Sequence, residues 1–82
     1  MLTLEEFKSM PLTYVAGYTA EHGAHRCYRN NEYKFQKEVL TRRFSGEWQK
    51  GEVYYYLDKV EEEFRTVEAV YEAYIKREKP NG

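Results

Sequence analysis

The stretch VYYYLDKVEEEFRTVEAVYEAYIKREKP, residues 53–80, decides the fold of this chain. Large apolar side chains recur in it at alternating spacings of four and three residues. This spacing returns each side chain to one face of an α-helix. The repeated positions are Val53, Leu57, Val60, Phe64, Val67, Tyr71 and Tyr74. The pattern predicts an uninterrupted helix over residues 60–77 whose Phe64, Val67, Tyr71 and Tyr74 are buried.

Capping signals suggest where this helix begins and ends. Asp58 is a good N-cap residue, and Glu61 completes a capping box three residues later. Acidic residues follow Asp58 and basic residues precede Pro80, an order that the helix dipole favours. We therefore expect a long amphipathic helix over about residues 58–78.

The N-terminal part predicts a short helix followed by strands. Thr3-Leu4-Glu5-Glu6 is a capping-box pattern, and Pro11 ends the helix that it starts. From Leu12 to Tyr28 the residues favour strand, and the dipeptides His22-Gly23 and Asn30-Asn31 favour turns. The expected fold is α+β: a short helix, a small antiparallel meander over about residues 12–57, and the C-terminal helix.

Residues 32–48 leave an alternative open. Tyr33, Phe35 and Val39 share one strand face, but the same segment partly fits a helix closed by Gly46. We favour strand, because strand-forming residues surround the segment. The alternative is an all-α hairpin with helices near residues 32–45 and 52–78.

Length and composition predict a single small domain over residues 1–82, with residues 80–82 as a frayed tail. The chain has 82 residues, of which 41% are hydrophobic and 33% charged, typical of a globular domain. Its one cysteine, Cys27, cannot form an internal disulfide, which favours a reducing, cytoplasmic location. No segment is long and apolar enough to span a membrane, and the first ten residues do not resemble a signal peptide.

A group of potential metal ligands lies at the first expected turn. Glu21, His22, His25 and Cys27 fall within seven residues. A closed zinc site needs four ligands at suitable spacing, and Glu21 is adjacent to His22, where its side chain points elsewhere. We therefore expect a polar turn with a half-buried thiol, without metal or cofactor.

Cys27 and His25 could also act as nucleophile and base, because residues two apart share a strand face. Nothing in the sequence orients the histidine, and catalysis needs a concave pocket that so small a domain seldom builds. The sequence therefore predicts no catalytic residues and no enzyme.

The aromatic content favours a contact surface. Aromatic residues make up 17% of the chain, and nine of them are tyrosines. On a strand, Tyr54 and Tyr56 point away from Tyr55, so rings would stand on both faces of the sheet. We expect a non-catalytic protein-binding or regulatory module of the adaptor, accessory-subunit or phage or mobile-element inhibitor type. A second copy could cover the same rings as a homodimer. The expected partner-binding residues are Tyr28, Arg29, Arg42, Arg43, Trp48, Tyr54 and Tyr56.

The alternative function is binding of RNA or single-stranded DNA through residues 25–44. Residues 24–51 carry seven basic and three acidic residues, and aromatic residues alternate with the basic ones. Rings beside cations on a sheet are a common way to hold single-stranded nucleic acid.

Overall fold

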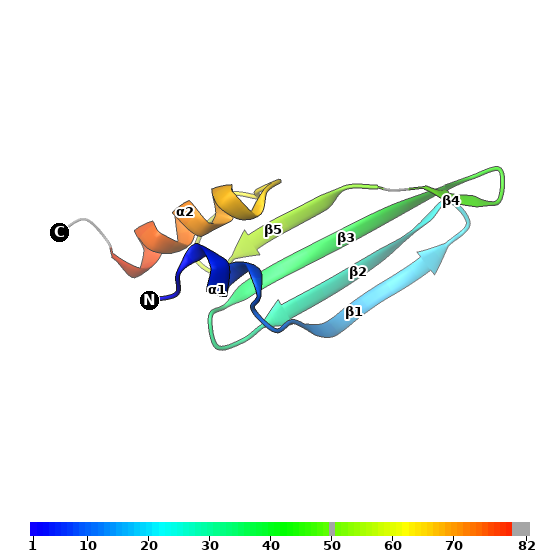
Figure 1. Cartoon of the computed structure of the whole chain (residues 1–82). Coiled ribbons are helices and arrows are strands. Elements are labelled where there is room, and N and C mark those ends of the chain that lie inside the picture. The colour runs from blue at the N-terminus through cyan, green and yellow to red at the C-terminus, as the bar shows by residue number, and fades with distance from the viewer. Residues whose placement is uncertain (50, 80–82) are drawn as a thin grey trace.

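The computed structural model describes residues 1–49 and 51–79. It contains the expected short helix, strands and C-terminal helix (Figure 1). Their order is α1 (Leu4–Lys8), β1 (Thr13–Ala20), β2 (Gly23–Asn30), β3 (Phe35–Phe44), β4 (Glu47–Gln49), β5 (Val53–Leu57) and α2 (Val67–Glu78). The α+β prediction is confirmed. The all-α alternative is wrong, because most of residues 32–45 belong to the longest strand.

The strands form one antiparallel sheet around β3. β2 pairs with β3 along one edge, and β1 pairs with the outer side of β2. The other edge of β3 is shared: β5 pairs with residues 35–39, and β4 pairs with residues 42–44. In the described part of the chain, β1 is therefore an edge strand with one unpaired side.

Residues with positive φ occur in two of the strand connections, although not at the predicted turn dipeptides His22-Gly23 and Asn30-Asn31. Ser45 and Gly46 have φ values of 51° and 81° in the tight β3–β4 hairpin. Positive φ at both central residues is the backbone that matches the right-handed twist of the strands. Lys34 closes the β2–β3 connection with φ 56°.

The hydrophobic core lies between one end of the sheet and the two helices. Phe7 of α1 packs against the rings of Phe35, Tyr71 and Tyr74, with centroids 4.8, 5.5 and 5.2 Å away. Leu57 and Val70 close the same cluster and are 3% and 0% exposed. The helices thus cover the sheet only where β3 begins and β5 ends.

The sheet continues well beyond the helices. The molecule measures 52 × 23 × 19 Å, with a radius of gyration of 14.4 Å. A compact domain of this length would have a radius of about 12 Å. In Figure 1 both helices lie at one end of the sheet, and the β1–β2 and β3–β4 turns project from the other. We call residues 16–25 and 40–49 the uncovered end; none of them is buried.

The C-terminal helix begins later than expected. α2 starts at Val67, and Thr66 is its N-cap, with Thr66 Oγ1 accepting from the Ala69 amide at 3.1 Å. The predicted helix over about 58–78, uninterrupted from residue 60, is therefore wrong for its first turns. Of the four side chains expected to be buried, Tyr74 is buried, and Phe64, Val67 and Tyr71 are half-buried against the core.

Two contacts explain the late start. The Asp58 carboxylate accepts from the Arg29 guanidinium instead of capping a helix, and Lys59 has φ 69°, outside the right-handed helical region. Phe64 is extended beside β5 and exchanges backbone hydrogen bonds with Tyr55 at 2.8 and 2.9 Å. Residues 59–65 thus cover the outer edge of β5.

The two ends of the chain meet at Leu2. The Leu2 amide donates to the Tyr74 hydroxyl at 3.0 Å, and the Tyr71 hydroxyl donates to the Leu2 carbonyl at 3.0 Å. These bonds hold the segment before α1 against α2.

None of the helices in the described residues is long and apolar enough to cross a membrane. The tail predicted at residues 80–82 lies outside the described residues.

Candidate functional site

The two faces of the sheet have different surroundings. The face that meets the helices carries Phe35, Tyr55 and Leu57. Alternation along paired strands places His25, Cys27, Glu38, Tyr54 and Tyr56 on the opposite face. Neither described helix packs on that side, so we call it the open face. The prediction that Tyr54 and Tyr56 point away from Tyr55 agrees with this register.

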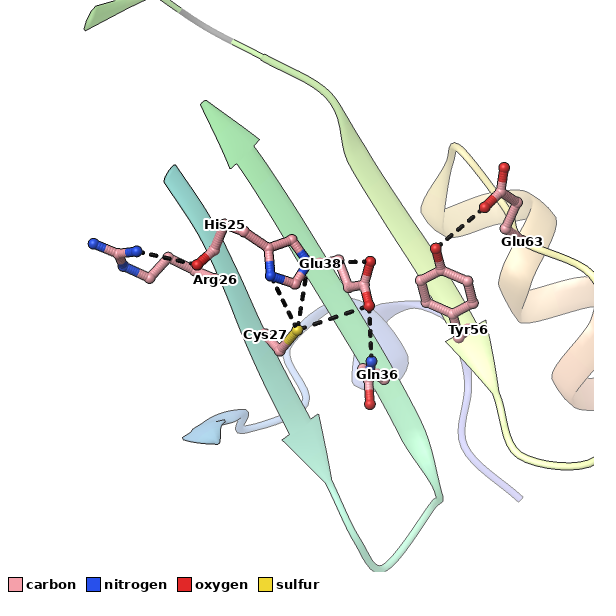
Figure 2. A network of polar contacts seen from close by, with 7 residues as sticks. All are labelled: His25, Arg26, Cys27, Gln36, Glu38, Tyr56 and Glu63. Atoms are coloured by element: carbon pink, nitrogen blue, oxygen red, sulfur yellow. Dashed lines mark hydrogen bonds and ion pairs between the residues drawn. The ribbon is translucent and has the colours of Figure 1, made fainter. Parts of the chain in front are cut away.

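Three potential ligand groups meet on the open face. Cys27 Sγ lies 3.7 Å from His25 Nε2 and 3.7 Å from Glu38 Oε1. His25 Nε2 lies 3.4 Å from Glu38 Oε2. Figure 2 shows the three side chains converging from two neighbouring strands, while Arg26 leaves β2 in another direction. We call this group the His–Cys–Glu cluster.

The strand register brings the cluster together. The turn at residues 31–34 sets Asn30 opposite Phe35, and three residues farther along the ladder Cys27 lies opposite Glu38. His25 is two residues from Cys27 on the same face of β2. The sequence reasoning predicted that His25 and Cys27 share a face but missed Glu38, whose position depends on this register.

Neighbouring polar groups fix the Glu38 carboxylate. Gln36 Nε2 donates to Glu38 Oε1 at 3.1 Å, and Arg29 Nη1 donates to Gln36 Oε1 at 3.4 Å. The Tyr18 ring stacks on the His25 imidazole, with centroids 5.4 Å apart and the planes inclined by 29°. The cluster is therefore held by side chains from β1, β2 and β3.

The cluster does not activate Cys27 as a nucleophile. Burial raises the pKa of the Cys27 thiol, and the Glu38 charge and hydrogen bond raise it further. A nucleophilic cysteine needs the opposite, because the thiolate is the reactive species. Glu38 does contact the His25 ring, so the histidine has the orienting partner that the sequence did not reveal. The environment of the thiol nevertheless favours its neutral form.

The four potential ligands that lie close together in the sequence are only partly brought together. His25 and Cys27 lie in the cluster, whereas Glu21 and His22 lie in the exposed β1–β2 turn. In the described part of the chain, the ligand atoms of His25, Cys27 and Glu38 all lie within 4.8 Å of one another. Glu38 thus completes the group in place of the turn residues Glu21 and His22.

Tyr56 lies beside the cluster and is kept protonated. Its hydroxyl donates to Glu63 Oε2 at 3.1 Å (Figure 2). Burial, the Glu38 charge and this hydrogen bond raise the pKa of Tyr56 to about 12. The neighbouring Tyr54 ring lies under the Arg65 guanidinium, at 4.5 Å from the ring centroid. Tyr54 and Tyr56, two of the three expected partner-binding tyrosines, therefore already contact the segment that follows β5.

The other expected partner-binding residues are spread over the sheet. Trp48, Arg42 and Arg43 are exposed at the uncovered end, with Arg43 over the Trp48 ring at 5.4 Å. Arg42 also pairs with Glu52 at 2.7 Å. Tyr28 contacts Tyr14 edge to face near the helices. The structure thus groups three of the seven residues at the uncovered end and leaves four nearer the core.

Sequence reasoning missed the exposed apolar residues of β1. All eight residues of this strand are exposed, and Tyr14, Val15 and Tyr18 are 52%, 49% and 65% exposed. Strand alternation in residues 13–20 was visible, but nothing in it showed that β1 lies at an edge beyond the helices. Phe44 and Trp48 at the uncovered end are likewise 55% and 50% exposed.

Arg26 crosses the edge strand on the helix side of the sheet. Its guanidinium donates to the Tyr18 carbonyl at 2.8 Å and to Thr19 Oγ1 at 2.8 Å. The side chain passes over Gly17, where a Cβ would lie 3.0 Å from Arg26 Cδ and 2.5 Å from the His25 carbonyl oxygen. Gly17 is therefore needed for this close crossing.

Comparisons of the chain with protein-family models, curated proteins and solved structures found no match.

Proposed function

We propose that this chain is a small non-catalytic protein-binding module, of the adaptor, accessory-subunit or inhibitor type, that binds its partner with the uncovered end of the sheet. One observation carries the proposal. Large apolar side chains stand exposed on both faces of this end, where the described chain supplies no second layer. An antiparallel sheet normally packs at least one face on a core.

The two faces offer different contacts. Tyr18 lies on the open face, and register places Phe44 on that face too. Arg43 and Trp48 lie across from each other on the face that meets the helices farther along. A partner that takes the projecting hairpins into a groove would bury aromatic rings on both sides. Large apolar side chains exposed together at one end of a domain suggest an interaction site.

The composition of the uncovered end favours a protein partner. Trp, Tyr and Arg are the residues most enriched among energetically dominant interface positions, and all three occur here. Its described charged residues balance, since Arg42 and Arg43 are matched by Glu21 and Glu47. An end without net positive charge gains little from phosphate contacts.

The alternative, binding of RNA or single-stranded DNA through residues 25–44, receives less support from the side-chain contacts. Arg29 pairs with Asp58, and Arg42 pairs with Glu52. Arg26 is used in backbone bonds to β1. Strand alternation also divides the basic side chains of this segment between the two faces. Nucleic-acid binding remains an outcome that the experiment below can detect.

Site-specific photo-crosslinking tests the proposal. A photoreactive phenylalanine analogue replaces Tyr18 or Trp48 in the full chain, expressed in the cells from which it derives. Glu72, on the exposed side of α2, is the matched control position. We expect a discrete protein adduct from Tyr18 and Trp48 that the Glu72 position does not give.

Each other result would contradict the proposal in a recognisable way. An adduct that nuclease removes would favour the nucleic-acid alternative. An adduct of twice the chain's mass would identify a homodimer, which sedimentation of the purified chain would check independently. Equal labelling from all three positions, or no adduct from Tyr18 and Trp48, would exclude the uncovered end as the contact surface.

A further inference from the structure

The His–Cys–Glu cluster has the donor set of a zinc site. A cysteine sulfur, an imidazole nitrogen and a carboxylate oxygen are the three ligand types that bind Zn²⁺ in proteins. Thiolate and imidazole together favour zinc over magnesium or calcium, which prefer oxygen ligands. The cluster contains one of each on two adjacent strands.

The distances between the donor atoms fit a tetrahedral metal. With bonds of about 2.3 Å to sulfur and about 2.0–2.2 Å to nitrogen and oxygen, tetrahedral neighbours lie about 3.3–3.6 Å apart. The corresponding separations here are 3.7 Å for Cys27 Sγ to His25 Nε2 and 3.7 Å for Cys27 Sγ to Glu38 Oε1. The separation from His25 Nε2 to Glu38 Oε2 is 3.4 Å. The thiol and the imidazole face different oxygens of the Glu38 carboxylate, so the carboxylate either binds the ion with both oxygens or rotates to bring one of them to it. With one ligand atom from each residue, the three atoms already lie within 4.8 Å of one another.

Charge and access also suit a divalent ion. A thiolate and a carboxylate together balance the two positive charges of zinc, so a half-buried site would hold no net charge. The His25 and Glu38 side chains are 23% and 21% exposed, which leaves a path for the ion from solvent. The hydrogen bond from Gln36 orients the carboxylate, as partners of metal-ligating carboxylates commonly do.

We propose that His25, Cys27 and Glu38 bind one Zn²⁺ on the open face of the sheet, with water in the fourth coordination position. All three ligands come from the sheet, so the fourth position faces away from it. This site borders the uncovered end, because His25 belongs to both and its ring stacks on Tyr18. Zinc titration of the purified chain and crosslinking from Trp48 nevertheless test the two proposals independently.

Metal titration of the full chain tests the site. The protein is reduced, freed of any polyhistidine tag, and titrated with Zn²⁺ by calorimetry. Titration with Co²⁺ serves as the spectroscopic probe. We expect one zinc per chain, and a thiolate-to-cobalt charge-transfer absorption that added zinc removes.

Variants assign the ligands. Cys27→Ser should abolish the charge-transfer absorption, and His25→Gln or Glu38→Gln should weaken zinc binding by at least about 100-fold, more than loss of an outer-shell partner costs. Gln36→Ala should weaken it about tenfold through the loosened carboxylate. His22→Gln, which changes the nearby turn histidine, is the matched control and should bind zinc like the unmodified chain.

Three results would overturn the proposal. The first is the absence of saturable zinc binding by the unmodified chain. The second is unchanged zinc affinity in both His25→Gln and Glu38→Gln, since thiol binding alone would then explain the spectrum. The third is a stoichiometry of one zinc for two chains. Far-ultraviolet circular dichroism confirms that each variant is folded, and Glu38→Gln preserves the shape of the side chain if Cys27→Ser does not fold.

Discussion

Replacement of Phe7 by alanine should remove much of the stability of this domain. Phe7 is 2% exposed, and three aromatic rings surround it within 5.5 Å. Phe→Ala at such a site costs about 3–5 kcal/mol in the free energy of unfolding. A domain of this length has about 4–12 kcal/mol in total, and each kcal/mol corresponds to about 4–8 °C in Tm. We therefore expect Tm to fall by at least about 12 °C.

The matched control is Phe44→Ala at the uncovered end. Phe44 is 55% exposed, so its removal should change the free energy of unfolding by no more than about 0.5 kcal/mol. Urea unfolding followed by far-ultraviolet circular dichroism measures both variants. Fluorescence of Trp48 is a poor reporter, because this side chain is half exposed far from the core. Equal losses in the two variants, or a loss below about 1 kcal/mol for Phe7→Ala, would refute the division into a core and an uncovered end.

Three further predictions follow from local contacts. Thr66→Ala removes the cap of α2 and should cost about 1 kcal/mol in urea unfolding, whereas no change would mean that the helix begins elsewhere. The hydrogen bond from Arg29 is the main cause of the lowered pKa of the Asp58 carboxyl. The Arg29–Asp58 pair therefore contributes fully to stability above the pKa of an unfolded aspartate, about 3.9. This contribution is lost as the pH falls through the lower pKa that Asp58 has in the folded chain. Asp58→Asn should flatten the acid branch of the stability profile, and an identical acid branch would contradict this. Because burial and the Glu38 charge raise the pKa of the Cys27 thiol, metal-free Glu38→Gln should be alkylated faster than the unmodified chain at neutral pH. An equal or slower rate would show that Glu38 does not suppress the thiolate.

The sequence predicted the order of elements but misplaced the start of α2, and the repeat of apolar residues explains why. A spacing of four keeps two side chains on one face of a helix and also on one face of a strand. Val53 and Leu57 are related in this way, and both lie in β5. Only spacings of three distinguish a helix from a strand, and in this repeat Phe64 to Val67 spans the N-cap rather than a helical turn.

Strand alternation in the sequence could predict two of the three residues of the candidate site. Alternation alone places His25 and Cys27 on one face. Adding Glu38 requires the exact pairing of β2 with β3, and a slip by one residue would turn the carboxylate to the other face. The Asn30-Asn31 dipeptide indicated a turn, but it did not indicate how many residues the turn contains. That number fixes the pairing of β2 with β3.

The crossing of Arg26 over Gly17 bears on how this chain stays in solution at high concentration. An exposed edge strand is a template on which further chains can add, and such growth leads to aggregates. The Arg26 guanidinium lies on this edge strand, where it donates to Thr19 Oγ1, and it places a charge beside the edge. A side chain at position 17 would disturb this crossing, because its Cβ would lie 2.5 Å from the His25 carbonyl oxygen and 3.0 Å from Arg26 Cδ. Gly17→Val should therefore increase the rate of fibril formation even where the core remains folded, which makes this glycine a determinant of solubility.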